Sequence, residues 1–214
     1  MQNRTLSPID KILASANNAL RTLAAPAGAG TRPNPSANIE EGELDDRQRA
    51  HAAGLMRVNH AGEIAAQALY QGHAAVARDE TVEAQMKHAA NEEFDHLAWC
   101  EQRITELGSR PSRLSPVWYT GAYAIGAASG VIGDKWSLGF IAETENQVCA
   151  HLESHLAGLP EDDAKSRAIV RQMHAEEAEH GKNAVDAGAA VLPGAVKRLM
   201  RTTAKVMTKT AYWF

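Results

Sequence analysis

The sequence predicts an all-α protein, built on four long helices with further amphipathic helices around them. Hydrophobic residues fill 44% of the 214 positions, enough for a sizeable core, whereas aromatic residues fill only 5%. A chain poor in aromatic residues and rich in alanine favours close-packed helices over a β-sandwich. Apolar residues also recur at helical spacing, and no stretch shows a convincing strand-like alternation.

The expected elements follow one another from the N-terminus. Residues 8–24 are expected to form a short amphipathic helix, and residues 26–43, rich in Pro, Gly, Ala, Ser and Asn, are typical of a flexible linker. We therefore divide the chain into residues 1–44, a helix and linker, and residues 45–214, a helical domain. Helical periodicity predicts four long helices at about 46–78, 81–107, 134–158 and 162–188, with breaks at 108–116, 159–160 and 193.

Residues 114–133 form an uncharged segment of 20 positions, about the length that spans a bilayer. Its glycine, serine and threonine residues make it only weakly hydrophobic, so we expect a buried or interfacial element and not a transmembrane helix. Charges near the N-terminus argue against a secretory signal. Two cysteines, Cys100 and Cys149, are too few for a disulfide framework and indicate free thiols.

The net charge of −4 argues against nucleic-acid binding and hides an asymmetry. The body of the chain is acidic, whereas the charged residues after Asp186 are all basic: Lys197, Arg198, Arg201, Lys205 and Lys209. They fall near one face of an expected C-terminal helix, with apolar residues on the other face and three aromatic residues, 212–214, at the end. This pattern is typical of a peripheral protein on an anionic membrane, and a helix packed on its own bundle stays the alternative.

Six ionisable residues stand where the four long helices should carry hydrophobic ones. Glu93, for example, shares the heptad position of Met86 and Cys100. A glutamate on one helix precedes a Glu-x-x-His motif on the next by 30 residues in the first half of the chain and by 32 in the second, as in two similar helical hairpins. The six residues are Glu63, Glu93, His96, Glu145, Glu177 and His180.

Four inward carboxylates would repel one another and lose their hydration, which is costly unless cations compensate them. Two divalent metal ions would balance the four negative charges. Each Glu-x-x-His pair projects from one helix face and is able to chelate one ion. Oxygen ligands with one nitrogen per ion suit iron or manganese better than zinc. The pattern is that of a ferritin-like four-helix bundle with a di-metal centre.

Neighbouring polar residues receive other roles. Three glutamates lie off the apolar faces and are expected to be exposed: Glu92, Glu176 and Glu179. We prefer Glu145 to Glu143 as a ligand because Glu145 lies on the apolar face of its helix. Other polar residues nearby are expected to be packed or at the surface, with a role in orienting a ligand left open: Asn59, His60, His151 and His155.

Four segments resemble the demethoxyubiquinone hydroxylase family. They are LMRVNHAGEIAAQALYQG around Glu63, EEFDHLAWCE around His96, GFIAETENQVCAHLESHL around Glu145 and EEAEHGKNA around His180. The resemblance covers about residues 45–214 and implies a ferritin-like, non-haem di-iron monooxygenase. It also implies the ligands: Glu63, Glu93 and His96 for one iron ion, Glu145, Glu177 and His180 for the other, with Glu93 and Glu177 also able to bridge.

The resemblance further implies the reaction, a late step of ubiquinone biosynthesis. One oxygen atom of O2, the co-substrate, would enter the ring of a polyprenylated demethoxyubiquinol at a centre of two Fe²⁺ ions per chain. The protein would lie on the cytoplasmic side of the cell membrane, as a peripheral protein, because the isoprenoid tail of its substrate lies in the bilayer. A ferritin-like iron-storage or detoxifying protein and a non-catalytic lipid-binding scaffold are the alternatives. The choice of iron or manganese, the oligomeric state and membership of a biosynthetic complex stay open.

Overall fold

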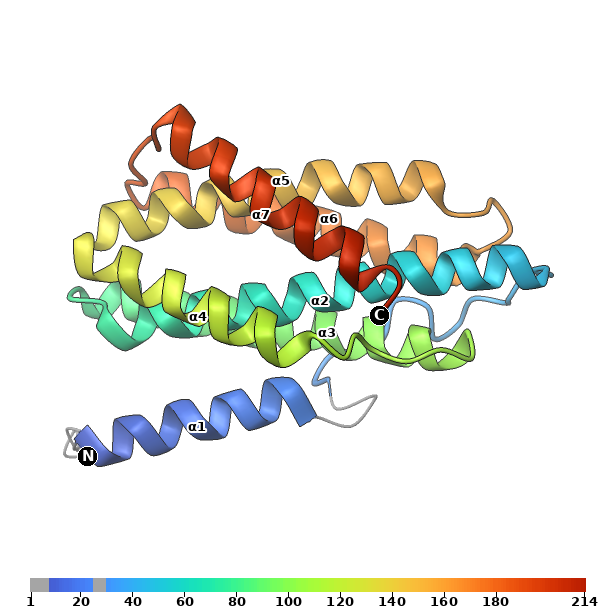
Figure 1. Ribbon diagram of the computed structural model, residues 1–214, viewed down its shortest axis with the longest axis horizontal. Helices are drawn as coiled ribbons and strands as arrows, with labels where there is room; N and C mark the ends of the chain where they lie inside the picture. The colour runs from blue at the N-terminus through green and yellow to red at the C-terminus, as the bar shows by residue number, and fades with distance from the viewer. Residues whose placement is uncertain (1–7, 25–29) are drawn as a thin grey trace.

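The computed structural model describes residues 8–24 and 30–214, and within this part it contains seven α-helices and no strand (Figure 1). The helices are α1 (Pro8–Ala24), α2 (Asp46–Val76), α3 (Glu80–Glu106), α4 (Ser115–Ile132), α5 (Asp134–Gly158), α6 (Ala164–Asp186) and α7 (Gly194–Ala211). The prediction of an all-α, ferritin-like bundle is confirmed. The four long helices expected from the sequence are α2, α3, α5 and α6.

Two of the hydrophobic clusters in the described residues join all four long helices, and a polar layer lies between these two. α2 packs on α3 and α4, and α5 pairs with α6. One cluster uses residues near one end of the four long helices: Met56, Ile104, Leu152 and Met173. The other cluster uses residues near the opposite end: Tyr70, Met86, Ile141 and Ala184. Residues 63, 93–96, 145 and 177–180 lie between these two sets in sequence on their own helices, so they meet in one layer.

Aspartates fix where three of the four long helices begin. The Asp45 carboxylate accepts the backbone N–H of Gln48 over 2.7 Å, and the Gln48 side chain accepts the Asp45 N–H, which forms a capping box at α2. Asp79 caps α3, and Asp163 caps α6 by accepting the Ser166 N–H over 2.9 Å. These caps set the residue at which each helix starts and therefore the face that each helix turns inward.

α4 is the weakly hydrophobic segment at residues 114–133, and it packs directly on α2. A Cβ on Gly126 would collide with the backbone carbonyl of Leu69, and a Cβ on Gly72 would collide with that of Tyr123. The glycines therefore let the two helix backbones come close together. Among the described residues, no helix is long and apolar enough to cross a membrane.

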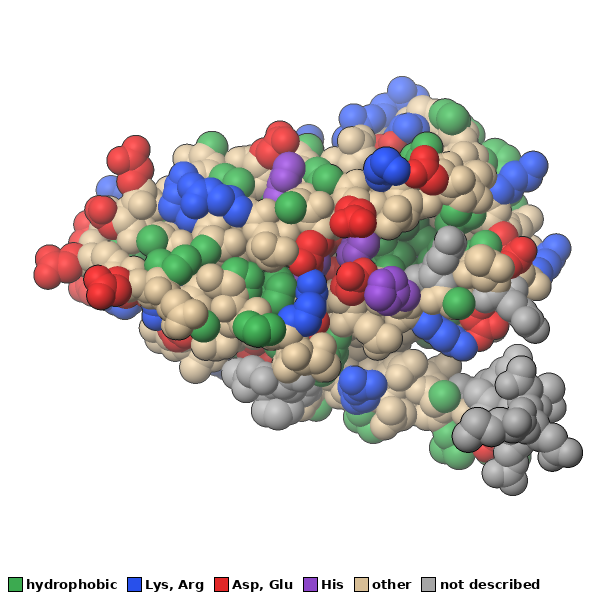
Figure 2. Space-filling model, turned by 180° about the vertical axis from the view of Figure 1, so that it is seen from behind, with side chains coloured by type: hydrophobic (Ala, Val, Ile, Leu, Met, Phe, Trp, Pro, Cys, Tyr) green, Lys and Arg blue, Asp and Glu red, His purple; other side chains and the backbone are tan. Residues whose placement is uncertain are grey.

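α7 runs across the front of the bundle in Figure 1 and divides its apolar residues between two surroundings. Half-buried ones face the bundle: Val196, Met200 and Met207. Strongly exposed ones face outward, Leu199 and Val206, and the residues Trp213 and Phe214 that follow the helix are exposed as well. An ion pair of 2.7 Å between Lys197 Nζ and Glu143 ties α7 to α5. On the opposite face of the molecule, acidic and basic side chains are interspersed (Figure 2).

Residues 30–44, which we call the N-terminal strap, run along the bundle without forming a helix. Glu41 pairs with the fully buried Arg103, which also lies 2.9 Å from Asp163 on one side and 2.9 Å from Ser166 on another. Leu44 is buried in the core. The stretch expected to be a flexible linker is therefore packed on the bundle over residues 30–43, while residues 26–29 lie outside the described part of the chain.

Candidate metal centre

Acidic and histidine side chains from four helices meet in the polar layer of the bundle. α2 and α5 contribute one glutamate each, and α3 and α6 contribute one Glu-x-x-His pair each. All six side chains are buried, with exposed fractions between 0% and 8%: Glu63, Glu93, His96, Glu145, Glu177 and His180. Each helix therefore turns the polar residue inward at the place where its apolar stripe predicts a core position.

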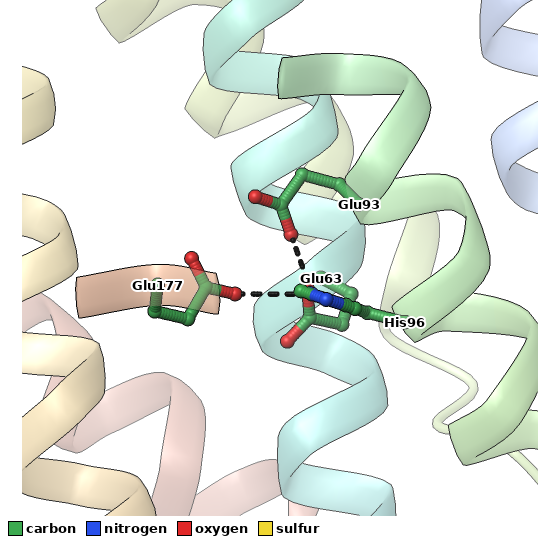
Figure 3. Close-up of side chains that lie close together, drawn as sticks. All are labelled: Glu63, Glu93, His96 and Glu177. Carbon is green, nitrogen blue, oxygen red and sulfur yellow. Dashed lines mark hydrogen bonds and ion pairs between the residues drawn. The ribbon is translucent and has the colours of Figure 1, made fainter. Parts of the chain in front are cut away.

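Four of these residues form a tight cluster (Figure 3). One ligand atom from each of Glu63, Glu93, His96 and Glu177 lies within 4.8 Å of the ligand atoms of the other three. His96 Nδ1 is 3.1 Å from Glu177 Oε1 and 3.2 Å from Glu93 Oε2. The same nitrogen is 3.5 Å from Glu63 Oε2. A small space among these atoms is thus surrounded by three carboxylates and one imidazole.

His180 extends the cluster on the other side of Glu93 and Glu177. Its Nδ1 is 3.1 Å from Glu93 Oε1 and 3.2 Å from Glu177 Oε2. Glu93 and Glu177 therefore present one oxygen to each histidine, and the centroids of the two imidazole rings are 6.4 Å apart. Two carboxylates thus lie between two histidines, and this is part of the donor set that di-metal helical bundles place in their cores.

Glu145 enters the layer from α5 and is held by a residue that the sequence analysis did not select as a site residue. Tyr70, itself buried, donates its hydroxyl to Glu145 Oε1 over 2.7 Å. A Cβ on Gly181 would lie 3.3 Å from the Cβ of Glu145, so α6 passes close to Glu145 directly after His180. Tyr70 stands seven residues after Glu63 on α2, and this shared heptad position is the signal that would have found it.

The charges of the layer are strongly coupled. Burial, together with repulsion from neighbouring carboxylates, raises the pKa of Glu63 and Glu145 well above the usual range. Burial also opposes charge on Glu93, but the imidazoles on both sides hold the pKa of that carboxyl well below its usual range. Against the same effect of burial, surrounding carboxylates raise the pKa of His96 well above its usual range and that of His180 to about 12. Without metal ions, the layer therefore retains protons that offset the negative charge of its carboxylates.

Unpaired carboxylate oxygens show that the residues fit metal ions. Within the described part of the chain, Glu145 Oε2 meets no hydrogen-bond donor, and Glu63 Oε2 and both oxygens of Glu93 face only the histidine Nδ1 atoms, at 3.1–3.5 Å and without hydrogen-bond geometry. A buried oxygen that lacks a donor is costly, and coordination to a cation would satisfy it. Four carboxylates balance the charge of two divalent ions, and two imidazoles add nitrogen ligands. This oxygen-rich set suits iron or manganese.

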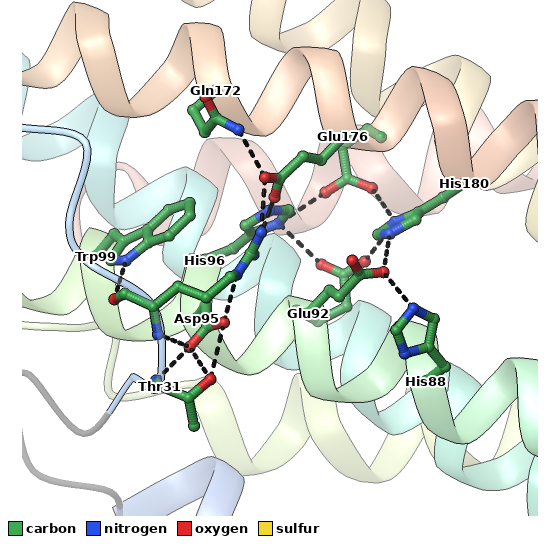
Figure 4. A network of polar contacts seen from close by, with 12 residues as sticks. Thr31, His88, Glu92, Asp95, His96, Trp99, Gln172, Glu176 and His180 are labelled. Carbon is green, nitrogen blue, oxygen red and sulfur yellow. Dashed lines mark hydrogen bonds and ion pairs between the residues drawn. The ribbon is translucent and has the colours of Figure 1, made fainter.

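Two glutamates that were expected to be exposed lie against the centre, so that expectation was wrong for both (Figure 4). Glu176 Oε2 is 2.5 Å from His96 Nε2, and Glu92 Oε2 is 2.8 Å from His180 Nε2. Glu179, in contrast, is exposed as predicted. Glu92 and Glu176 each precede the glutamate of a Glu-x-x-His motif, and the doubled glutamate is the signal in the sequence that marks them.

The remaining polar candidates lie outside the cluster. Glu143 is buried but turned to Lys197 and Gln147. None of four other residues contacts the six side chains through a hydrogen bond or ion pair in the described structure: Asn59, His60, His151 and His155. Burial lowers the pKa of His60 to about 4 and that of His155 to about 3, as expected of neutral, packed histidines.

A protein family and several known proteins match this chain over most of its length. The family described as "Ubiquinone biosynthesis protein COQ7" matches residues 50–211. A protein of Chromobacterium violaceum is 55% identical over 95% of this chain and 98% of its own length. One from Dechloromonas aromatica is 54% identical, over 98% of this chain and all of its own length. One from Pseudomonas aeruginosa strain PAO1 is 51% identical, over 98% of each chain. All three relatives are named 3-demethoxyubiquinol 3-hydroxylase.

Proposed function

This chain belongs to the ubiquinone biosynthesis protein COQ7 family, and from that premise we propose that it hydroxylates the ring of a polyprenylated demethoxyubiquinol with O2. The observation that carries the proposal is the buried layer in which Glu93 and Glu177 lie between His96 and His180. Such a layer supports a centre of two redox-active ions, and the relatives' names support the substrate class.

We assign the six predicted residues as ligands of two iron ions. Glu63, Glu93 and His96 would hold one ion, and Glu145, Glu177 and His180 would hold the other. When bound, iron supplies the electrons that activate O2. The second oxygen atom of O2 would leave as water, which takes up two electrons from a reductant and two protons.

The residues of the chain supply positioning and shielding. Glu92 and Glu176 face the outer nitrogens of the two histidines and so direct each Nδ1 inward. Tyr70 holds Glu145 by its hydroxyl. The two hydrophobic clusters above and below the layer exclude bulk water, which strengthens every electrostatic interaction inside it.

The membrane surface is the place where we propose that the protein meets its substrate, as a peripheral protein on the cytoplasmic side. Basic residues and exposed apolar residues share the outward side of α7, including Arg201, Leu199 and Val206. α4 also exposes Val117 and Ile125. Exposed apolar side chains flanked by basic ones favour an anionic lipid interface.

Quinone profiling of a deletion strain tests the proposed reaction. Wild-type protein should restore the normal quinone, whereas Glu177→Gln should leave the demethoxy intermediate to accumulate, because it removes a charge shared by both histidines. Glu179→Gln is the matched control, since Glu179 lies two residues away but is exposed, and it should restore the quinone fully.

A normal quinone pool in the deletion strain would contradict the hydroxylase and favour iron storage or detoxification. Full restoration by Glu177→Gln would instead contradict the assigned ligands.

A further inference from the structure

The N-terminal strap lies against α3 beside the proposed metal centre. The Thr31 N–H donates to Asp95 Oδ1 over 2.5 Å, and the Thr31 hydroxyl lies 3.1 Å from the same oxygen. A Cβ on Gly30 would lie only 3.1 Å from Asp95 Oδ1 and 3.2 Å from the Cβ of Ala98. Asp95 directly precedes His96, so the strap is anchored next to a proposed ligand.

The side chain of Arg32 then joins α3 to α6. Its Nε is 2.6 Å from Asp95 Oδ2 on α3. Its Nη1 and Nη2 are 2.7 and 3.0 Å from the two oxygens of Glu176 on α6. The guanidinium also lies over the ring of Trp99, 4.9 Å from its centroid. A two-pronged pair fixes the orientation of a carboxylate as well as its position.

Glu176 passes this restraint on to His96 (Figure 4). Glu176 Oε2 is 2.5 Å from His96 Nε2, and Gln172 donates to Glu176 Oε1 over 2.6 Å. The partner of one imidazole nitrogen sets the plane of the ring and therefore the direction of the other nitrogen. A fixed Glu176 accordingly fixes where His96 Nδ1 points.

The equivalent side chain on the other half of the centre lacks such a restraint. Glu92 faces His180 Nε2 at 2.8 Å, and among the described residues its one further ion-pair contact is with His88 Nε2, at 3.7 Å. The His88 side chain is 78% exposed and that of Glu92 is 30% exposed, against 16% for Glu176. The two halves of the centre thus match in their inner residues and differ in what holds them from outside.

We propose that Arg32 is a positioning residue of the metal centre, which orients His96 through Glu176 and holds that half more rigidly than the His180 half. The proposal rests on the proposed function for the identity of the centre. The proposal gives the N-terminal strap a role in the site. Arg32 lies far from the Glu-x-x-His motifs in sequence, but it contacts Glu176, the carboxylate that faces His96. The two metal positions are consequently unequal.

Titration of the full-length protein with Co²⁺, under anaerobic conditions, tests this inequality. Wild type should bind two ions, and Arg32→Gln should weaken one binding event by about tenfold while leaving the other unchanged, which is the usual effect of losing an outer partner of a ligand. Arg32→Lys should not restore the affinity, because an ammonium group lacks the fork that contacts Asp95 and Glu176 together.

Three further variants separate positioning from mere attachment of the strap. Glu41→Gln loosens the strap at Arg103, remote from the histidines, and should leave both binding events unchanged. Arg32→Gln should have no further effect in a Glu176→Gln background, and its full effect in a Glu92→Gln background. Equal losses in both backgrounds, or the same loss from Glu41→Gln, would overturn the proposal.

A second measurement does not depend on metal. In ¹⁵N-histidine-labelled protein without added ions, Arg32→Gln should shift the ring signals of His96 and leave those of His180 in place. Unshifted His96 signals would contradict positioning by Arg32. If wild type bound no Co²⁺ but the His96 signals still moved, the proposed function would fail while the positioning role would stand.

Discussion

Each histidine of the centre has a carboxylate against both ring nitrogens. Nδ1 faces the shared glutamates inside the layer, and Nε2 faces a glutamate of the opposite helix: Glu176 of α6 for His96 of α3, and Glu92 of α3 for His180 of α6. An imidazole with acceptors on both sides is a double donor, as in its protonated form. Protons on these rings are therefore the natural counterions of the carboxylates whenever metal is absent.

Metal binding should consequently compete with protons. The pKa of His96 is raised well above its usual range and that of His180 to about 12, so at neutral pH both rings must lose a proton before they bind an ion. Apparent affinity should fall as the pH falls, and protons should be released on binding. Calorimetric titration in buffers of different ionisation enthalpy measures that release of protons. A metal affinity that does not change with pH within about one unit of neutrality would contradict the prediction.

The inner residues could be predicted from the sequence, and their outer partners could not. Glu93 and Glu177 interrupt apolar stripes, and that interruption is visible within one helix. Arg32 gives no such signal, because its position depends on Asp95 and Glu176, which lie on other elements. The expected exposure of Glu92 and Glu176 was wrong because a position off the apolar face of a helix need not face solvent. In this bundle both positions face a histidine of the neighbouring helix.

At the level of elements, α4 packs closely on α2, and glycines of both helices make this contact possible. The glycines of α4 make the segment too weakly hydrophobic to resemble a transmembrane helix. Close contacts require a glycine on each of the two helices: Gly126 of α4 lies on the Leu69 carbonyl, and Gly72 of α2 lies on the Tyr123 carbonyl. Small residues at a helix crossing allow backbones to approach where a larger side chain would hold them apart.

A pair of glycine substitutions tests this contact. Gly126→Ala should lower the free energy of unfolding by about 1–3 kcal/mol, since its Cβ would overlap the α2 backbone. Gly121→Ala, on the same helix but with no atom within 4 Å of its Cβ, should leave stability unchanged or raise it by up to about 1 kcal/mol. Denaturant unfolding of both variants measures the difference, and equal stabilities would argue against close α2–α4 packing.

Helices of regular periodicity were predictable, and the strap was not. The boundaries of α1 and α5 follow directly from their apolar pattern and from the flanking Pro and Gly residues. The strap has a composition typical of a linker, but hydrogen bonds and ion pairs of Arg103 and Asp95 bind it to the bundle. Contacts between residues about 60 positions apart leave no periodic trace in a single sequence.

On the scale of the whole molecule, a charged layer divides the hydrophobic core in two. The apolar clusters on either side of it supply the burial that stabilises the fold. The layer itself costs stability, since buried carboxylates without cations are unfavourable. Ions bound there should therefore stabilise the whole bundle.

The exposed apolar residues on the outward side of α7 lead to a prediction about how the whole molecule binds a membrane surface. The double variant Leu199→Ser and Val206→Ser should weaken binding to vesicles of phosphatidylcholine with anionic phosphatidylglycerol by at least about tenfold, because two exposed apolar side chains are lost. Val185→Ser is the matched control, since Val185 is 60% exposed, comparable to Leu199 and Val206, but belongs to α6. Vesicle flotation measures binding, and equal binding by all three proteins would place the interface elsewhere.

The central claim is that the layer between the two clusters binds two metal ions. Anomalous X-ray diffraction at the iron absorption edge, from crystals loaded with Fe²⁺ without oxygen, tests it most directly. Two peaks are predicted between Glu93 and Glu177, one beside His96 and the other beside His180. The absence of any peak there, or iron bound only at the protein surface, would contradict the account.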